Sequence, residues 1–190
     1  MDNEIIIASG NKGKIKEAQE ILNEYKIISL KELGVDIDVE EDKETFEENA
    51  IKKAREISKE LNGKMCISDD SGIEIDFLNG FPGVFTKRWH VGTDRERNLE
   101  IIKKLDGVKK ENRKMSFTTA IALAKGDEII TGVATINGYV AESIRGENGF
   151  GFDEIFELEN GKTLAELSPE EKNEVSARKI ALEIIKTKLK

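Results

Sequence analysis

Two adjacent carboxylates, Asp69 and Asp70, directly follow the apolar run Met65-Cys66-Ile67. The run is typical of the end of a buried strand, where paired carboxylates need a compensating charge. At the carboxyl end of a strand they would lie where α/β sheets bind their ligands. They suit a hard cation such as Mg2+, and one of them could take a proton from an attacking water. The alternative is a capped turn, because Asp-Asp-Ser-Gly is also favourable turn sequence.

Composition excludes several other kinds of site. The chain of 190 residues has one histidine, His90, and one cysteine, Cys66, so it cannot build a multi-histidine zinc site or an internal disulfide. Hydrolytic chemistry would therefore depend on carboxylates and a hard metal. The net charge of −8 argues against general nucleic-acid binding, although 30 basic residues suffice for one local anion site.

No membrane association is expected from the sequence. No apolar run approaches the length that spans a bilayer. The first residues, Met1-Asp2-Asn3-Glu4, lack the basic region and apolar core of an export signal. We therefore expect a cytoplasmic protein.

The N-terminal segment has the pattern of a strand, a Gly-rich loop and a helix. Glu4 to Ala8 is a β-branched run, residues 9–14 read Ser-Gly-Asn-Lys-Gly-Lys, and helical spacing of apolar residues begins at Ile15. Such a loop can bind phosphate through backbone N–H groups and the helix N-terminus, and Lys14 could add a charge. It is not a Walker loop, and an ordinary strand-to-helix turn is the alternative.

A second helix is predicted after an acidic loop. Residues 25–29 predict a strand, and Glu41 lies in the acidic loop that follows. Thr45 and Glu48 match a capping box, which opens a helix that continues to Leu61. Most charges on this helix are typical of a solvated face, but Lys53 points away from its neighbour Lys52 and could face a cleft.

The middle of the chain predicts a turn, a helix and a hairpin. Residues 79–83 form a tight turn, and Arg88 follows in a loop with basic residues that could face phosphate or solvent. A capping box at Thr93 opens a helix that ends near Gly107. Residues 114–125 and 128–140 predict two strands joined by a two-residue hairpin.

Glycines and aromatics alternate in Gly149-Phe150-Gly151-Phe152-Asp153. This pattern permits close approach to a ligand and offers a flat face for stacking, and a bulged strand with buried aromatics is the alternative. Ser168 begins a third capping box, and the last helix is expected to bury a stripe with Ile180 and Ile184. Lys172 and Arg178 near its start are typical of solvated charges.

Interspersed strands and helices with a central hairpin predict an α/β protein with a mixed sheet and helices on its faces. The length predicts a single domain, residues 1–190, although two lobes around a cleft would also fit.

Taken together, the motifs resemble the inosine/xanthosine triphosphate pyrophosphatase family. They occur in the family's order from residue 9 to residue 178: Ser9-Gly10-Asn11 with Lys14 and Glu17, Thr45-Phe46 with Glu48-Asn49-Ala50 and Lys53-Ala54, Asp69-Asp70-Ser71-Gly72, Gly80 with Pro82-Gly83, Gly149 to Asp153, and Glu171-Lys172 followed by Ser176 and Arg178. One such motif is weak, whereas the ordered set is specific.

The resemblance implies a Mg2+-dependent hydrolase that converts ITP, dITP and XTP to the nucleoside monophosphate and pyrophosphate. It implies an elongated mixed sheet flanked by helices, with two lobes around a central substrate cleft, and a homodimer. Asp70 would be the general base, and Glu41, Asp69 and Asp70 would form the metal site. The implied substrate-binding residues are Ser9, Gly10, Asn11, Lys14, Lys53, Ser71, Arg88, Phe150, Gly151, Phe152, Asp153, Lys172 and Arg178.

The sequence departs from the family pattern at Ala177, where the family has histidine, and at Phe152, which is commonly tyrosine. The missing imidazole belongs to base recognition, so relaxed base selectivity is one alternative. A non-catalytic nucleotide-binding sensor with the same pocket is another. An aspartyl-phosphate phosphatase is disfavoured, because residues 69–72 lack its pair of aspartates two positions apart.

Overall fold

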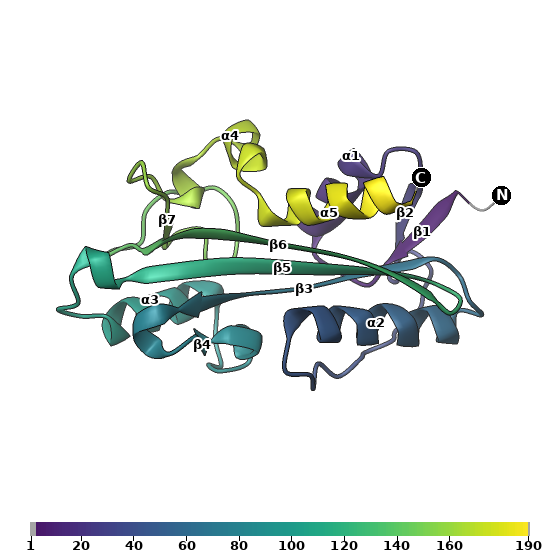
Figure 1. Ribbon diagram of the computed structural model, residues 1–190, viewed down its shortest axis with the longest axis horizontal. Helices are drawn as coiled ribbons and strands as arrows, with labels where there is room; N and C mark the ends of the chain where they lie inside the picture. The colour runs from purple at the N-terminus through teal and green to yellow at the C-terminus, as the bar shows by residue number, and fades with distance from the viewer. Residues whose placement is uncertain (1–2, 190) are drawn as a thin grey trace. The chain divides into compact units, whose positions relative to one another are not determined.

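The computed structural model describes residues 3–189, so the predicted features of Met1 and Asp2 lie outside the described part of the chain. Figure 1 shows helices on the faces of a β-sheet. The strands are β1 (Glu4–Ile7), β2 (Lys26–Ser29), β3 (Cys66–Ile75), β4 (Phe81–Pro82), β5 (Lys114–Lys125), β6 (Glu128–Val140) and β7 (Phe156–Glu157). The helices are α1 (Lys12–Ile21), α2 (Phe46–Glu60), α3 (Asp94–Lys104), α4 (Pro169–Glu174) and α5 (Ala177–Lys188).

Within the described residues, seven strands form one mixed sheet. Its order is β2-β1-β3-β5-β6-β7, and β4 pairs with β3 at its side. Strand β1 runs parallel to β2 and to β3, and its last residue, Ile7, pairs with Ile67. Strands β4 and β7 are antiparallel to β3 and β6. The predicted mixed sheet with flanking helices is confirmed.

The chain divides into two compact units. The first contains the described residues up to Ser71 together with 119–134 and those from Ala177 onward, and the second contains 72–118 and 135–176. Strands β3, β5 and β6 each contribute residues to both units. The predicted single domain with a substrate cleft stays a prediction.

In the first unit, helices cover both faces of the strands. Helix α2 lies on one face, and α1 and α5 lie together on the other (Figure 1). The β-branched run of β1 is buried, and Ala50 and Ala54 allow α2 to approach the strands closely. Thr45 caps α2 by accepting a hydrogen bond from the Glu48 amide, as the capping pattern predicts.

The second unit has its own core, which packs α3 against β3 and the segment around β7. Its fully buried members include Ile73, Ile101, Leu105 and Phe156. Capping boxes open α3 at Thr93 and α4 at Ser168, as predicted. The long strands β5 and β6 have the predicted bounds and are joined by residues 126–127.

Two predictions about the elements are wrong. Asp69 and Asp70 do not end a strand, because β3 continues to Ile75; they lie just beyond the end of the neighbouring parallel strand β1. The C-terminal segment is not one helix, since α4 ends at Glu174 and α5 begins at Ala177. The buried residues of α5 are Ala177, Arg178, Ala181, Leu182 and Ile185, and Ile180 is 45% exposed.

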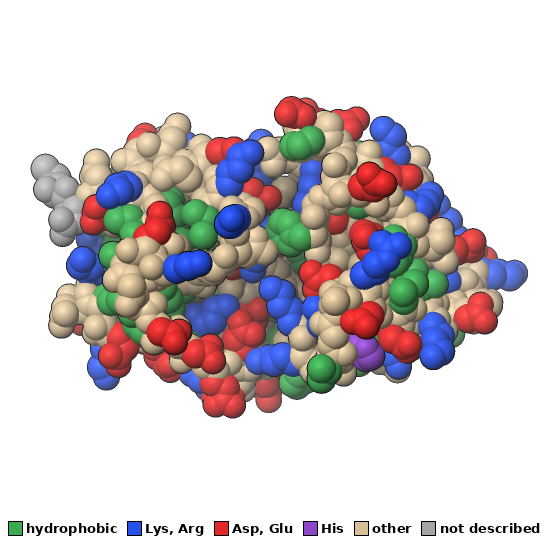
Figure 2. Space-filling model, turned by 180° about the vertical axis from the view of Figure 1, so that it is seen from behind, with side chains coloured by type: hydrophobic (Ala, Val, Ile, Leu, Met, Phe, Trp, Pro, Cys, Tyr) green, Lys and Arg blue, Asp and Glu red, His purple; other side chains and the backbone are tan. Residues whose placement is uncertain are grey.

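Acidic and basic side chains are interspersed over the face in Figure 2, and its hydrophobic patches are small. This is the surface expected of a chain in which 36% of residues are charged. Among the described residues, no helix is both long enough and apolar enough to cross a bilayer.

Candidate active site

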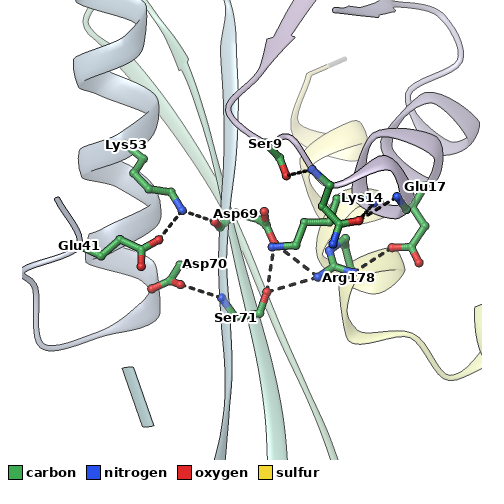
Figure 3. A network of polar contacts seen from close by, with 11 residues as sticks. Ser9, Lys14, Glu17, Glu41, Lys53, Asp69, Asp70, Ser71 and Arg178 are labelled. Carbon is green, nitrogen blue, oxygen red and sulfur yellow. Dashed lines mark hydrogen bonds and ion pairs between the residues drawn. The ribbon is translucent and has the colours of Figure 1, made fainter. Parts of the chain in front are cut away.

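Adjacent aspartates on β3 project to opposite faces of the sheet, because successive side chains on a strand alternate. Asp69 meets Lys14 of α1 and Arg178 of α5, whereas Asp70 meets Asn49 of α2. Figure 3 shows Lys14 and Arg178 on one side of the strand and Asp70 on the other. Each carboxylate is only 8% exposed, so its partners determine its protonation.

Asp69 is held ionised by cations from helices distant in sequence. Its Oδ2 accepts hydrogen bonds from Lys14 Nζ at 2.6 Å and from the Ser71 hydroxyl at 3.0 Å, and Arg178 Nη2 lies at 3.4 Å. Burial alone would raise the pKa of Asp69, but Lys14, Arg178 and Lys53 outweigh it and hold that pKa well below its usual range. Asp69 is therefore an anion at every physiological pH.

Asp70 has the opposite electrostatic environment. Burial, followed by the negative charge of Glu41, raises the pKa of Asp70 to about 6. Its carboxylate accepts hydrogen bonds from Asn49 Nδ2 and from the Ser71 amide, both at 3.0 Å. A carboxylate with a pKa just below neutrality is ionised at pH 7 and more basic than an ordinary aspartate. Asp70 is thus suited to accept a proton from water.

Lys53 of α2 links the acidic loop to β3. Its Nζ donates to Glu41 Oε1 at 2.7 Å and to the backbone carbonyl of Asp69 at 2.6 Å. The loop is also fixed by Asn49, whose Oδ1 accepts from the Lys43 amide at 2.9 Å. These contacts place Glu41 beside Asp70 and give Lys53 the inward direction that was predicted for it.

The first loop uses part of its polar groups to begin α1. Asn11 is the N-cap, and its Oδ1 accepts from the amides of Gly13 and Lys14. Ser9 accepts from the Asn11 amide through its hydroxyl, and Gly10 is exposed. The structure therefore contains the ordinary capped turn that was the alternative. Phosphate binding by Ser9, Gly10 and Asn11 stays a prediction.

Arg178 is buried, which overturns the expectation of a solvated charge. It lies in the first unit, where Nη1 binds Glu17 at 3.1 Å and Nη2 approaches both Asp69 and Ser71 at 3.4 Å. With Lys14 and Asp69 it lines a small pocket in this unit. The predicted contact of Arg178 with a base is not tested by these interactions.

In the second unit, residues 149–154 form a compact loop that we call the aromatic turn. Asp153 accepts from the Phe150 amide at 2.8 Å and from Lys172 Nζ at 2.6 Å. Gly149 has φ +84°, and a Cβ there would lie 2.1 Å from Asp153 Oδ2, so this position requires glycine. The turn therefore has a fixed shape, closed by Asp153.

The two aromatic side chains of this turn face different environments. Phe150 is 37% exposed, and Lys172 Nζ lies 4.7 Å from the centre of its ring. Phe152 is buried in the core of the second unit. Phe150 is thus partly exposed and Phe152 has a packing role, and the contact of either ring with a base stays a prediction. Arg88 is exposed and donates to the Val84 carbonyl.

Glu41 and Asp70 are the donors that fit a divalent cation. Their negative charges act on each other, and two carboxylates with substrate phosphates form the usual Mg2+ site. No group of three or more His, Cys, Asp or Glu suited to a metal occurs within residues 3–189. Oδ2 of Asp69 is already bonded to Lys14 and Ser71, so its predicted part in the metal site is at most supporting.

Two residues of this site were not assigned a role from the sequence. Asn49 is fully buried and fixes both Asp70 and the acidic loop, and Glu17 is the carboxylate partner of Arg178. Asparagine is unfavourable inside a helix, so its place in α2 was a detectable signal. The signal for Glu17 was its place in the first family motif, since a glutamate on a helix is otherwise typical of the surface.

Comparisons with known proteins identify the family of the chain. Residues 5–188 match the Ham1 family. A dITP/XTP pyrophosphatase of Clostridium perfringens is 43% identical over 97% of this chain and 96% of the relative, and that of Bacillus subtilis is 45% identical over 94% and 93%. The solved structure of the Staphylococcus aureus Ham1 protein superposes with a TM-score of 0.88 at 38% identity, covering 98% of this chain and 97% of that one. The chain therefore belongs to the Ham1 family.

Proposed function

We propose that the protein hydrolyses the non-canonical purine nucleoside triphosphates ITP, dITP and XTP to nucleoside monophosphate and pyrophosphate. The observation that carries this proposal is the pair of aspartates on β3, one held ionised by cations and the other raised in pKa to about 6. The substrate class follows from relatives named dITP/XTP pyrophosphatase that are 43% and 45% identical to this chain.

In the first unit, Lys14 and Lys53 supply positive charge for the triphosphate. Asp70 takes a proton from a water molecule, whose oxygen attacks the α-phosphorus. The bond from that phosphorus to the oxygen bridging to the β-phosphate breaks, and pyrophosphate leaves with the electron pair. Catalysis of this kind depends mainly on positioning and electrostatics. The buried hydrogen bonds of Asn49 and Ser71 hold the Asp70 carboxylate in place for this step.

Glu41 and Asp70 would hold Mg2+. When bound, the cation would neutralise phosphate charge beside the acidic residues. The Lys53–Glu41 ion pair, 2.7 Å long, keeps the Glu41 carboxylate directed toward β3. Loss of activity on chelation, restored by Mg2+ and not by monovalent salt, would support this assignment.

In the second unit, the aromatic turn recognises the base. Phe150 stacks on the purine ring, and Asp153 and Lys172 hold its polar edge. The 6-oxo group of such a purine can accept hydrogen bonds from donors in the site. Adenine has a 6-amino group instead and would leave those donors unpaired, and a mismatch of this kind discriminates strongly between bases. Ala177 replaces the family's histidine and is fully buried, so relaxed discrimination is the outcome to test against this proposal.

The deciding experiment measures hydrolysis of ITP, dITP, XTP, ATP and GTP with Mg2+ and separates pyrophosphate from single phosphate. Pyrophosphate release from the first three, with ATP and GTP nearly inert, supports the proposal. Release from all five retains the chemistry and refutes the base selectivity. Binding without turnover identifies the non-catalytic sensor. In Asp70→Asn, turnover should be lost while nucleotide binding remains, and unchanged turnover would exclude Asp70 as the base.

We also propose a homodimer in the cytoplasm. The second unit exposes several large apolar side chains on residues 77–99, namely Phe77, Phe85, Val91 and Leu99. A second copy would remove this apolar area from water. Light scattering after size exclusion should give twice the chain mass of 21.3 kDa, and Phe85→Ser should lower it. A monomer mass for the unmodified protein at micromolar concentration would refute the dimer.

A further inference from the structure

Asn98 is a fully buried amide on α3 that contacts the aromatic turn of the same unit. Its Nδ2 donates to the carbonyl of Gly151 at 2.9 Å and to Glu154 Oε2 at 3.2 Å. Glu154 in turn accepts from Arg95 Nη1, also on α3, at 3.1 Å. Helix α3 therefore holds the aromatic turn at two successive points of its backbone path, and Asn98 takes part in both.

The Gly151 carbonyl needs such an anchor for a conformational reason. Gly151 has φ +67°, and a Cβ at this position would meet nothing within 4 Å. Glycine moves between positive and negative φ at little cost, so the peptide that follows Gly151 can rotate. This peptide lies between exposed Phe150 and Phe152, which is in the core. A hydrogen bond from a rigid, buried donor removes this freedom.

Packing alone does not account for an asparagine at position 98. Within the described residues, Asn98 Oδ1 is buried and has no hydrogen-bond partner. A buried acceptor left unpaired destabilises a fold, and a leucine of similar size would avoid that cost. The amide is therefore retained for the two hydrogen bonds that its Nδ2 group makes.

Resting on the proposed function, we propose that Asn98 is a positioning residue for base recognition. By fixing the Gly151 carbonyl, it holds the aromatic turn in the shape that presents Phe150 to a 6-oxo purine. Asn98 touches no reacting atom, so its loss should weaken binding of the base and leave phosphate binding and the chemical step unchanged. This separates it from Asp70, which acts on the chemical step.

The test is Asn98→Leu, with Asn98→Ser as a milder variant that has a shorter side chain and a smaller effect on folding. For both, KM for ITP should rise about tenfold while kcat stays within about twofold, because the hydrogen bonds to the Gly151 carbonyl and to Glu154 are lost and the chemistry is untouched. The inhibition constant of inorganic tripolyphosphate, which has no base, should not change. Equal losses for ITP and tripolyphosphate, or an unchanged KM for ITP, would overturn the proposal.

Glu154→Gln is the matched control. It keeps the Asn98 contact, since a glutamine oxygen also accepts, and it removes only the charge that pairs with Arg95. Its kinetic constants should equal those of the unmodified protein. A KM shift as large as that of Asn98→Leu would overturn the proposal, because this variant keeps both Asn98 contacts and loses only the charge of the Arg95–Glu154 ion pair.

A second measurement separates this inference from the proposed function. Hydrogen exchange of the Phe150 amide, which donates to Asp153 at 2.8 Å, should accelerate in Asn98→Ser while α3 and the core strands keep their protection. If the unmodified protein does not hydrolyse ITP, the proposed function fails, and this exchange still tests the positioning role. Unchanged exchange at Phe150 would refute that role.

Discussion

Replacing each aspartate of β3 by asparagine should change the stability of the metal-free protein in opposite directions at pH 7.5. Asp70→Asn removes a carboxylate whose pKa is raised from 3.8 to about 6, mainly by burial and then by Glu41. A shift of that size means that the ionised carboxylate lowers the free energy of unfolding by about 3 kcal/mol at pH above 6. Asparagine can accept only one of the two hydrogen bonds that Asn49 and Ser71 donate. The lost hydrogen bond offsets about 1 kcal/mol of the stability gained. The net gain is about 2 kcal/mol, or a rise in Tm of about 4–8 °C.

Asp69→Asn should instead destabilise the protein. It leaves the buried Lys14 ammonium without its carboxylate, whereas Arg178 keeps Glu17. Breaking a buried ion pair costs about 3–5 kcal/mol, and the retained Glu17 contact favours the lower end of that range. A loss of about 3 kcal/mol lowers Tm by about 6–12 °C in a protein of this size.

The pH dependence provides the sharper check. Because the folded-state pKa of Asp70 is raised, its carboxyl group contributes stability at low pH that is lost as pH rises from about 4 to about 6. Asp70→Asn cannot titrate, so its advantage should be present at pH 7.5 and absent near pH 4. Thermal unfolding followed by circular dichroism in EDTA measures both variants. Tm shifts of the same sign at pH 7.5, or an equal gain for Asp70→Asn at both pH values, would refute this assignment.

Three further outcomes are expected. Burial raises the pKa of the Cys66 thiol to about 12, so a thiol reagent at pH 8 should label it only after denaturation, and rapid labelling of the native protein would contradict its burial. Lys53→Met should lower kcat for ITP about 100-fold, because it removes a cation that is hydrogen-bonded to β3. Lys59 is exposed on the same helix, and Lys59→Met should leave kcat unchanged. Equal kinetics of the two variants would contradict a role of Lys53 in binding the triphosphate. Arg113→Met removes three buried hydrogen bonds to backbone carbonyls and should cost about 3 kcal/mol in thermal unfolding with kcat preserved, and an unchanged Tm would contradict that contribution.

The two units divide the proposed work between them. Phosphate binding and the proton transfer are assigned to the first unit, and base recognition is assigned to the aromatic turn of the second. Base selectivity and turnover should therefore be separable by mutation, because changes at Asn98 and at Asp70 alter different groups. We expect the replacement of the family's histidine by Ala177 to affect base selectivity more than the chemical step.

Much of the site was predictable because its residues occur in short motifs. Capping at Thr45, Thr93 and Ser168 depends on contacts within three residues, and all three begin helices where the patterns place them. The aromatic turn closes on itself through Asp153 and Phe150, again within three residues. Interactions of this range are encoded in consecutive residues, so the sequence reveals them directly.

Other features could not be predicted from local patterns. Asp69 and Asp70 lie inside a strand and not at its end, because β3 continues to Ile75 and its last residues pair with β4. Arg178 has the sequence context of a surface charge and is buried against Asp69 and Glu17. Asn98 lies on a helix that was predicted from local patterns, but it contacts a carbonyl 53 residues away.

The sequence by itself determined the class of fold and the family, since both depend on ordered local patterns, and it predicted which groups react. The resemblance already named Asp70 as the base, but only the tertiary structure gives the physical reason why two adjacent aspartates differ in pKa. Lys14 lies 55 residues from Asp69, and Arg178 lies 109 residues away, and both reach it from one face of the sheet. Asp70 faces the other side, near Glu41 and away from those cations, and its pKa rises. A pKa depends on burial and on nearby charge, and both are properties of the folded chain.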